Sequence, residues 1–243
     1  MPAPRFYCPQ RLGPGQQLDL PPDAAHHAAR VLRLAVGDAV TLFNGEGGEY
    51  PAALTHIGKN NVTAKTGPWL ERDSESPLEV RLAQAVSAGD KMDFTLQKAV
   101  ELGIRAIQPL LAERCVVKLA GERAEKRTQH WQGVVVAACE QSGRNFVPAV
   151  APLQTLPNWL AARGPEGLGL LLSPFAESSL SDLAPPAGPV TLLIGPEGGF
   201  SDNEVKMAAS RGFTPVRLGA RVLRTETAAL AALAAMQALW GDF

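Results

Sequence analysis

The N-terminal part of the chain alternates short apolar stretches with turn-forming residues. These stretches are rich in β-branched residues and are separated by Asn-Gly, Gly-Gly and Asn-Asn pairs, a pattern typical of short strands joined by tight turns. The predicted strands cover residues 38–45, 49–58 and 60–67. One helix is predicted over 22–34, with Asp23 as the expected N-cap and alanines after it.

From Leu78 onward the pattern changes, because apolar runs alternate with segments in which hydrophobic positions recur every three or four residues. The runs predict buried strands at 78–86, 104–112, 168–174, 189–195 and 214–220, and the periodic segments predict helices at 90–103, 121–143 and 225–240. Such alternation indicates a parallel sheet with helices on both faces. With the polar segment 71–77 as linker, we interpret the chain as a β-rich domain over 1–72 followed by an α/β domain over 77–243.

The bulk composition is that of an ordinary globular protein. Of the 243 residues, 46% are apolar and 19% are charged, and the formal net charge is −1 with a pI near 6.4. No global field therefore draws the chain toward nucleic acid or a membrane surface. Any contact with RNA has to use local basic patches.

The cysteines and histidines argue against disulfides and metal sites. Cys8, Cys115 and Cys139 are far apart and form no CxxC pair, which favours a reducing compartment over a disulfide framework or a zinc site. His26 and His27 are adjacent and would diverge by about 100° on a helix, so they cannot chelate together. With neither a signal peptide nor an apolar run of membrane-spanning length, the sequence predicts a cytoplasmic protein without a bound metal.

The glycine-rich loop GPEGGFS, residues 195–201, is the most informative candidate site, because ligands of open α/β sheets bind where loops leave the carboxyl ends of strands. Ser201 and Glu204 predict a capping box at the start of the next helix. The loop fits neither GxxxxGK[ST] nor GxGxxG, and Glu197 would repel a phosphate. A neutral or cationic ligand, such as the sulfonium of S-adenosylmethionine, fits better; the simpler alternative is a tight strand-to-helix connection.

A second loop, LGARVLRT at 218–225, precedes the alanine-rich helix at the end of the sequence. It contains two arginines, and if it lies at the same sheet edge as the first loop, the two form a concave site with polar backbone and fixed charges. The alternative is a helix with a polar first turn, in which Glu226 only complements the helix dipole.

Several motifs together resemble the ribosomal small-subunit methyltransferase E family, the 16S rRNA (uracil N3)-methyltransferases of the SPOUT superfamily. They are HHAARVLRLAVGD, KMDFTLQKAVELG, ERCVV, CEQSGRN, IGPEGGFSDNE and LGARVLRTETA, in the same order along nearly the whole chain. The resemblance implies an N-terminal PUA-like RNA-binding β-barrel and a C-terminal α/β domain whose parallel sheet carries a SPOUT-type trefoil knot. It also implies a homodimer that binds S-adenosyl-L-methionine near the subunit interface.

Carried onto this chain position by position, the resemblance implies that backbone groups of three loops hold the adenine and methionine parts of the cofactor. The implied cofactor-binding residues are Leu172, Ser173, Ile194, Gly195, Pro196, Glu197, Gly198, Gly199, Leu218, Gly219, Val222, Leu223 and Thr225. One position departs from the family, since Val100 stands where a threonine often precedes the ELG glutamate. Any role of a hydroxyl group there is lost.

Methyl transfer from a sulfonium is an in-line displacement, for which an enzyme mainly supplies alignment. Uracil N3 is a poor nucleophile while it keeps its proton, so either a general base removes the proton or arginines stabilise charge that develops on O2 and O4. We favour the arginines and leave the base open. The candidate arginines are Arg144, Arg221 and Arg224, and the candidate carboxylates are Glu101, Glu140 and Glu226. For each arginine alone, a solvated salt bridge is the simpler alternative.

The target base has to be splayed out of structured RNA, and basic clusters would hold the neighbouring phosphates. The candidate RNA-binding residues are Arg5, Arg11, Arg30, Arg33, Arg114 and Lys118. Arg30 and Arg33 would share a helix face if the predicted helix continues that far. Such clusters are otherwise ordinary solvated surface.

Three other functions compete with this interpretation. The first is a SPOUT methyltransferase that acts on another RNA or on a ribose 2′-hydroxyl. The second is a non-catalytic RNA-binding protein of ribosome assembly, which would not bind S-adenosylmethionine tightly. The third, a nucleotide hydrolase, is disfavoured because the loop lacks the P-loop lysine and carries Glu197.

Overall fold

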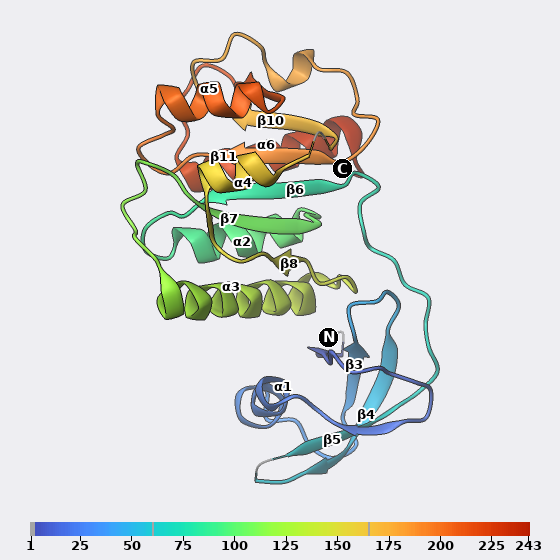
Figure 1. The fold of residues 1–243 in the computed structure, drawn as a ribbon. Coiled ribbons are helices and arrows are strands. Elements are labelled where there is room, and N and C mark those ends of the chain that lie inside the picture. Colours follow the sequence, from blue (N-terminus) through green and yellow to red (C-terminus); the bar gives the residue numbers. More distant parts are fainter. Residues whose placement is uncertain (1–2, 60, 165) are drawn as a thin grey trace. The chain divides into compact units, whose positions relative to one another are not determined.

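The computed structural model describes residues 3–59, 61–164 and 166–243, and the chain divides into two compact units (Figure 1). The first unit comprises residues 1–75 and 139–147, and the second comprises residues 76–138 and 148–243. The division after residue 75 falls within the predicted linker at 71–77. The segment 139–147 was assigned to the α/β domain from the sequence, but it belongs to the first unit.

In its described residues the first unit holds a five-stranded sheet with the order β1-β3-β4-β5-β2. The strands are β1 (Arg5–Tyr7), β2 (Gln17–Asp19), β3 (Ala39–Phe43), β4 (Tyr50–Ile57) and β5 (Val62–Thr66). β1 pairs with β3 in parallel, and the other neighbours are antiparallel. β3, β4 and β5 confirm the three predicted strands, although Asn60 lies outside the described residues. β1 and β2 are too short to give an alternating pattern in the sequence.

The helix predicted over 22–34 is shorter and less regular than expected. An α-helix α1 (Pro22–His26) continues into a π-helical turn η1 (His27–Val31), and the N-cap is Pro21 rather than Asp23, which lies in the first turn. Arg33 follows with a φ of 54°, in the left-handed region. The condition for Arg30 and Arg33 to share a helix face is therefore not met, because the helix ends at Val31, before Arg33.

The second unit is built on a sheet whose strand pairings are all parallel. Its order in the described residues is β12-β10-β11-β6-β7-β8, with β9 also paired to β7. The strands are β6 (Val80–Ala85), β7 (Ala106–Leu111), β8 (Ala149–Val150), β9 (Gln154–Thr155), β10 (Leu168–Leu172), β11 (Val190–Ile194) and β12 (Phe213–Val216). All five predicted strands are confirmed.

Helices cover both faces of this sheet (Figure 1). They are α2 (Lys91–Glu101), α3 (Gly121–Ser142), α4 (Leu156–Ala162), α5 (Asp202–Ser210) and α6 (Thr225–Trp240), with a short 3₁₀ turn η2 (Leu180–Asp182). α4 packs with α5 over Ala83, Leu171 and Leu193, while α2 packs with α6 on the opposite face. Alternate strand residues thus enter separate apolar layers, which explains why these strands are apolar almost throughout.

Membrane-spanning helices and metal clusters were searched for in the part of the chain that the structure describes. None of its helices has the length and apolarity needed to cross a bilayer. Nor do three or more His, Cys, Asp or Glu residues gather there as metal ligands would. Cys8 and Cys139 are buried free thiols, and burial raises the pKa of each to about 12.

Candidate active site

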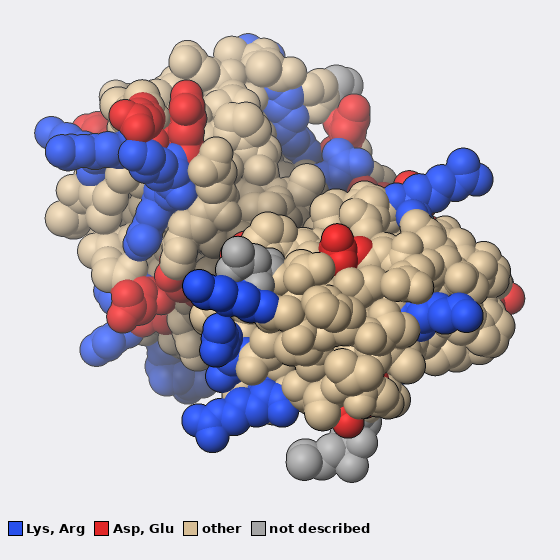
Figure 2. Space-filling model, turned by 90° about the horizontal axis from the view of Figure 1, so that it is seen from below, with Lys and Arg blue, Asp and Glu red and all other residues tan. Residues whose placement is uncertain are grey.

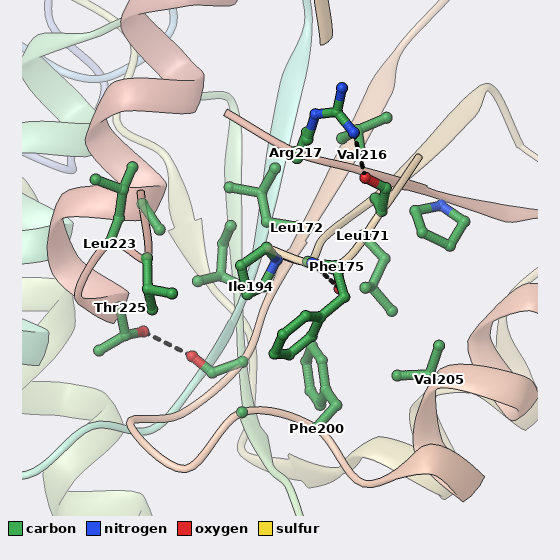
Figure 3. A pocket seen from close by; sticks show the side chains of 18 of the residues that line it. Leu171, Leu172, Phe175, Ile194, Phe200, Val205, Val216, Arg217, Leu223 and Thr225 are labelled. Carbon is green, nitrogen blue, oxygen red and sulfur yellow. Dashed lines mark hydrogen bonds between the residues drawn. The ribbon is translucent and has the colours of Figure 1, made fainter. Parts of the chain in front are cut away.

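A cavity of about 1190 Å³ lies at the carboxyl ends of β10, β11 and β12, in the second unit. Three loops and the start of α6 line it, as expected for a ligand site at the carboxyl ends of parallel strands. Figure 3 shows that Leu172, Ile194 and Leu223 form an apolar wall, with Phe175 and Phe200 on a neighbouring side. The cavity therefore offers a mostly apolar surface with a few polar groups at defined places, as small-molecule sites do.

The glycine loop after β11 is held in one conformation by the residues at its end. Ser201 caps α5 by accepting a 3.4 Å hydrogen bond from the amide of Glu204, and the Glu204 carboxylate accepts a 2.9 Å bond from the amide of Ser201. The other carboxylate oxygen of Glu204 accepts from the amide of Glu113 at 2.8 Å. The predicted capping box is confirmed, and it also ties the loop to the segment after β7.

Glycine is needed in this loop because neighbouring atoms lie close to its backbone. A Cβ at Gly198 would lie 3.0 Å from Cβ of Arg114, and Gly199 has a φ of 68°. The amide of Gly199 donates to the carbonyl oxygen of Pro196 at 2.8 Å, which closes the turn. A tight backbone turn with little side-chain cover thus borders the cavity.

Glu197 is engaged by the chain itself. Its Oε1 accepts hydrogen bonds from the amide of Ala88 at 3.1 Å and from Nζ of Lys91 at 3.0 Å. Burial alone would raise the pKa of Glu197, but the backbone amides and the Lys91 ammonium outweigh it and lower the pKa. Glu197 thus lines the cavity and also joins the glycine loop to the start of α2 through Oε1, so its preference for a neutral or cationic ligand stays a prediction.

Thr225, the first residue of α6, makes two hydrogen bonds beneath the cavity. Its hydroxyl donates to the carbonyl oxygen of Gly195 at 2.6 Å and accepts from Nε2 of Gln84 at 3.0 Å. Gln84 lies in β6 and is fully buried. These bonds fix the beginning of α6 against two central strands. Sequence reasoning missed Gln84, although a lone amide within the apolar run LEVRLAQAV was a signal.

Most of the residues implied for cofactor binding come together around this cavity. Those that line it are Leu172, Ser173, Ile194, Gly195, Pro196, Glu197, Gly198, Gly199, Leu218, Val222, Leu223 and Thr225. Gly219 does not line it and instead supplies a turn with a φ of 75°. Phe175, in the predicted loop after Leu172, also lines the cavity, as do Lys91 and Arg217, which were not anticipated. Arg217 donates from Nη1 to the carbonyl oxygen of Ala176 at 2.9 Å, so it braces the loop after β10.

The six candidate catalytic residues do not form one group. Arg221 and Arg224 are exposed and line the cavity, and the structure gives neither a side-chain partner among the described residues. Glu226 lies in the first turn of α6, and its Oε2 is buried without a hydrogen-bond partner in the described part of the chain. Glu101, at the end of α2, forms an ion pair with Lys98 at 2.7 Å.

The other two candidates, Glu140 and Arg144, are structural residues of the first unit. Glu140 accepts a hydrogen bond from the amide of Tyr7 at 2.9 Å, and burial raises its pKa. Arg144 is buried and forms a bidentate ion pair with Glu75. Its Nε donates to Oε1 at 3.0 Å, and its Nη2 donates to Oε2. The expected substrate-facing role of Arg144 has no support in this geometry, because its guanidinium is already engaged.

Arg5 also proves to be a structural residue. Its guanidinium pairs with Glu49, donates to Asn145 and lies 4.9 Å from the ring centroid of Phe43. The Arg5 side chain is only 11% exposed, so the prediction that it contacts RNA is wrong for this conformation. Arg11, Arg30 and Arg33 are exposed in the first unit, as is Lys118 in the second.

Arg114 differs from the other candidate RNA-binding residues because it borders the cavity. Its Nη1 donates to the carbonyl oxygen of Gly198 at 3.1 Å. Figure 2 shows that lysine and arginine side chains form separate groups with wide neutral areas between them on the face drawn. Positive charge is therefore local, as the net charge near zero implied.

Comparison with known proteins places the whole chain among methyltransferases. Residues 74–237 match the family described as an RNA methyltransferase domain, and residues 20–66 match an RNA methyltransferase PUA domain. The chain is 30% identical over 240 residues to ribosomal RNA small subunit methyltransferase E of Buchnera aphidicola, which covers 99% of this chain and 95% of that protein.

Two solved structures share the fold over their full length, and both hold the same small molecule. One is a ribosomal RNA small subunit methyltransferase E from Neisseria gonorrhoeae bound to S-adenosyl methionine, with a TM-score of 0.92, 46% identity and 99% coverage of both chains. The other is a putative methyltransferase from Legionella pneumophila in complex with the bound cofactor SAM, with a TM-score of 0.96, 41% identity and 100% coverage of both chains.

Proposed function

Because the chain belongs to the ribosomal RNA small subunit methyltransferase E family, we propose that it transfers the methyl group of S-adenosyl-L-methionine to N3 of a uridine in 16S ribosomal RNA. One observation carries this proposal: the loops after β10, β11 and β12 enclose a single cavity whose rim holds two uncommitted arginines, Arg221 and Arg224. The trefoil knot that the family resemblance implies is part of the same proposal.

The cavity fits the proposed methyl donor. Its volume of about 1190 Å³ leaves room for the donor and for part of an acceptor, since pockets for small ligands span roughly 300–1000 Å³. Leu172, Ile194 and Val216 supply apolar surface for a flat base, while the turn at Gly198 and Gly199 exposes backbone. These are the residue types that hold an adenosyl group by shape and backbone contacts.

When bound, S-adenosylmethionine supplies an electrophilic methyl group on a sulfonium. The contribution of the chain is alignment, which the Thr225 hydrogen bonds to Gly195 and Gln84 provide by fixing two of the loops relative to the sheet. Arg221 and Arg224 can place positive charge beside O2 and O4 of uracil, where negative charge grows as N3 loses its proton. Both are free to do so because neither guanidinium is engaged within the described residues.

Glu226 is the candidate base whose carboxylate is least engaged by the described part of the chain, although it does not itself line the cavity. Glu101 is paired with Lys98 and Glu140 accepts from the amide of Tyr7, whereas Oε2 of Glu226 is buried with no partner in the residues described. Glu226 also directly follows Arg224 and Thr225, which line the cavity. A carboxylate with a free oxygen at this position can accept the proton of N3.

The first unit would hold the RNA around the target base. The exposed Arg11, in the loop between β1 and β2, and the exposed Arg30 and Arg33, in and just after η1, suit phosphate contacts, and the PUA family match covers 20–66. We further propose a homodimer in the cytoplasm. Val222 lines the cavity and is 77% exposed, an apolar surface that a second subunit would cover near the site.

The proposal is tested by incubating the purified protein with isotope-labelled S-adenosylmethionine and either protein-free 16S RNA or small ribosomal subunits. The RNA is then digested to nucleosides, which are separated by mass. Label in 3-methyluridine supports the proposal. Label in a 2′-O-methyl nucleoside, or no transfer to either substrate while the protein binds the donor, contradicts it.

A further inference from the structure

Phe175 combines a fixed backbone with a side chain that packs against almost nothing. It lies in the loop after β10, lines the cavity and is 90% exposed. Figure 3 shows its ring extending into the hollow between the other two loops. Exposed single apolar residues are common on surfaces, but an aromatic ring that projects into a ligand cavity has a surface ready for a ligand.

The backbone around Phe175 is held on both sides. Its amide donates to Oγ of Ser173 at 3.3 Å, and the amide of Ala176 donates to the carbonyl oxygen of Ser173 at 3.2 Å. Arg217 holds the carbonyl oxygen of Ala176, and Ala176 itself is only 9% exposed. The side chain therefore projects from a fixed turn, so its exposure does not come from a loose loop.

Phe200 lines the same cavity but is attached differently. It is half-buried and packs against the apolar layer between the sheet and α4 and α5. A Cβ on Gly195 would lie 3.3 Å from the Phe200 ring, so Gly195 leaves the space that this ring occupies. Phe200 is a fixed wall, and Phe175 is the aromatic surface still open to a ligand.

We infer that Phe175 packs its ring against the adenine of the bound methyl donor and closes the outer side of the cofactor cavity. This inference rests on the proposed function. The ring has no hydrogen-bonding group and so suits the face of a flat heteroaromatic base. The turn that carries Phe175 begins at the end of β10, directly after Leu172, which belongs to the apolar surface proposed above for the flat base.

Isothermal calorimetry on the full-length protein tests the inference with S-adenosylmethionine and with S-adenosylhomocysteine, which keeps the adenine and lacks the sulfonium charge. Phe175→Ala is expected to weaken both ligands by about tenfold, the size of one base–aromatic stack. Phe175→Tyr is expected to restore the affinity, while Phe175→Leu restores it only in part. Phe243→Ala, which removes an exposed ring at the C-terminus outside the cavity, serves as the matched control.

Each other outcome contradicts the inference. Loss of affinity for S-adenosylmethionine alone would mean that the ring contacts the sulfonium as a cation–π partner. Unchanged affinity for both ligands, together with a raised KM for the RNA, would mean that the ring contacts the target base instead. If the unsubstituted protein binds neither ligand, the proposed function fails, and that result is distinct from a failure of the variant.

Discussion

The hydroxyl of Thr225 donates a 2.6 Å hydrogen bond to the carbonyl oxygen of Gly195, although the two residues lie thirty positions apart. The same hydroxyl accepts from the buried amide of Gln84. A residue at the start of the last helix thus fixes both the glycine loop and a central strand. The geometry of the cavity depends on this contact, because two of its three loops meet there.

Replacing Thr225 with valine keeps the shape of the side chain and removes both hydrogen bonds. We expect the free energy of unfolding to fall by about 1–3 kcal/mol, since two buried polar groups lose a partner. Affinity for S-adenosylmethionine should fall as well. Thr227→Val, on the exposed side of the same helix turn, is the control and should change neither value. Chemical denaturation and calorimetry measure the two effects, and a stable Thr225→Val protein with normal affinity would contradict the assigned role.

Glu197→Gln tests whether the ion pair between Glu197 and Lys91 stabilises the folded protein. The folded protein holds the pKa of Glu197 below its ordinary value of 4.5, so the stabilisation is present above that value and is lost as the pH falls through the lower, folded pKa. The pair is partly exposed, and we expect less than about 1 kcal/mol. The stability difference between the two proteins should shrink in acid. A stability difference that stays the same at neutral and at acidic pH would contradict this role.

Arg221→Ala and Arg224→Ala separate catalysis from stability. Both side chains are exposed and lack partners among the described residues, so the free energy of unfolding should change by less than about 0.5 kcal/mol. If the guanidinium groups stabilise charge on the uracil, kcat should fall by roughly 10²–10³ for at least one of them. Arg211→Ala, at the C-cap of α5, is the control. Full kcat in both variants and in the double variant would rule out arginine stabilisation.

The corrected role of Arg5 predicts an effect on folding. Arg5 and Glu49 are both nearly buried, and without Arg5 the Glu49 carboxylate keeps only the exposed Arg72, at 3.3 Å, as its charged partner among the described residues. Arg5→Ala should therefore lower the free energy of unfolding, by less than the roughly 3–5 kcal/mol that a fully uncompensated buried charge costs. Arg11→Ala should leave stability unchanged and weaken RNA binding. Equal stability of the two variants would contradict the structural role of Arg5 and favour the RNA contact that the sequence predicted.

The positions of the candidate cofactor loops could be predicted from the sequence because local signals mark them. Gly195 and Gly219 each come at the end of a predicted strand, and the pair Ser201 and Glu204 predicts the start of the next helix. Parallel strands bring their carboxyl ends together, so three loops distant in sequence had to meet at one edge. The strand pattern predicted where these loops meet, and the family resemblance implied that they hold the cofactor.

Contacts made across the fold could not be predicted in the same way. Arg5, Arg144 and Glu197 each find partners from distant segments, and a charged residue in a sequence does not reveal whether its partner will be the chain or a ligand. The residues that sequence reasoning missed were missed for the same reason. Gln84 interrupts an apolar strand, and its purpose is visible only once Thr225 is placed beside it.

Mass spectrometry of 16S ribosomal RNA from cells that lack this protein tests the central claim most directly. We predict that one 3-methyluridine disappears, that the unsubstituted gene restores it, and that the Arg224→Ala form restores it poorly or not at all. An unchanged set of modified nucleosides in the deleted cells would contradict the assignment of this cavity to methyl transfer onto uracil N3.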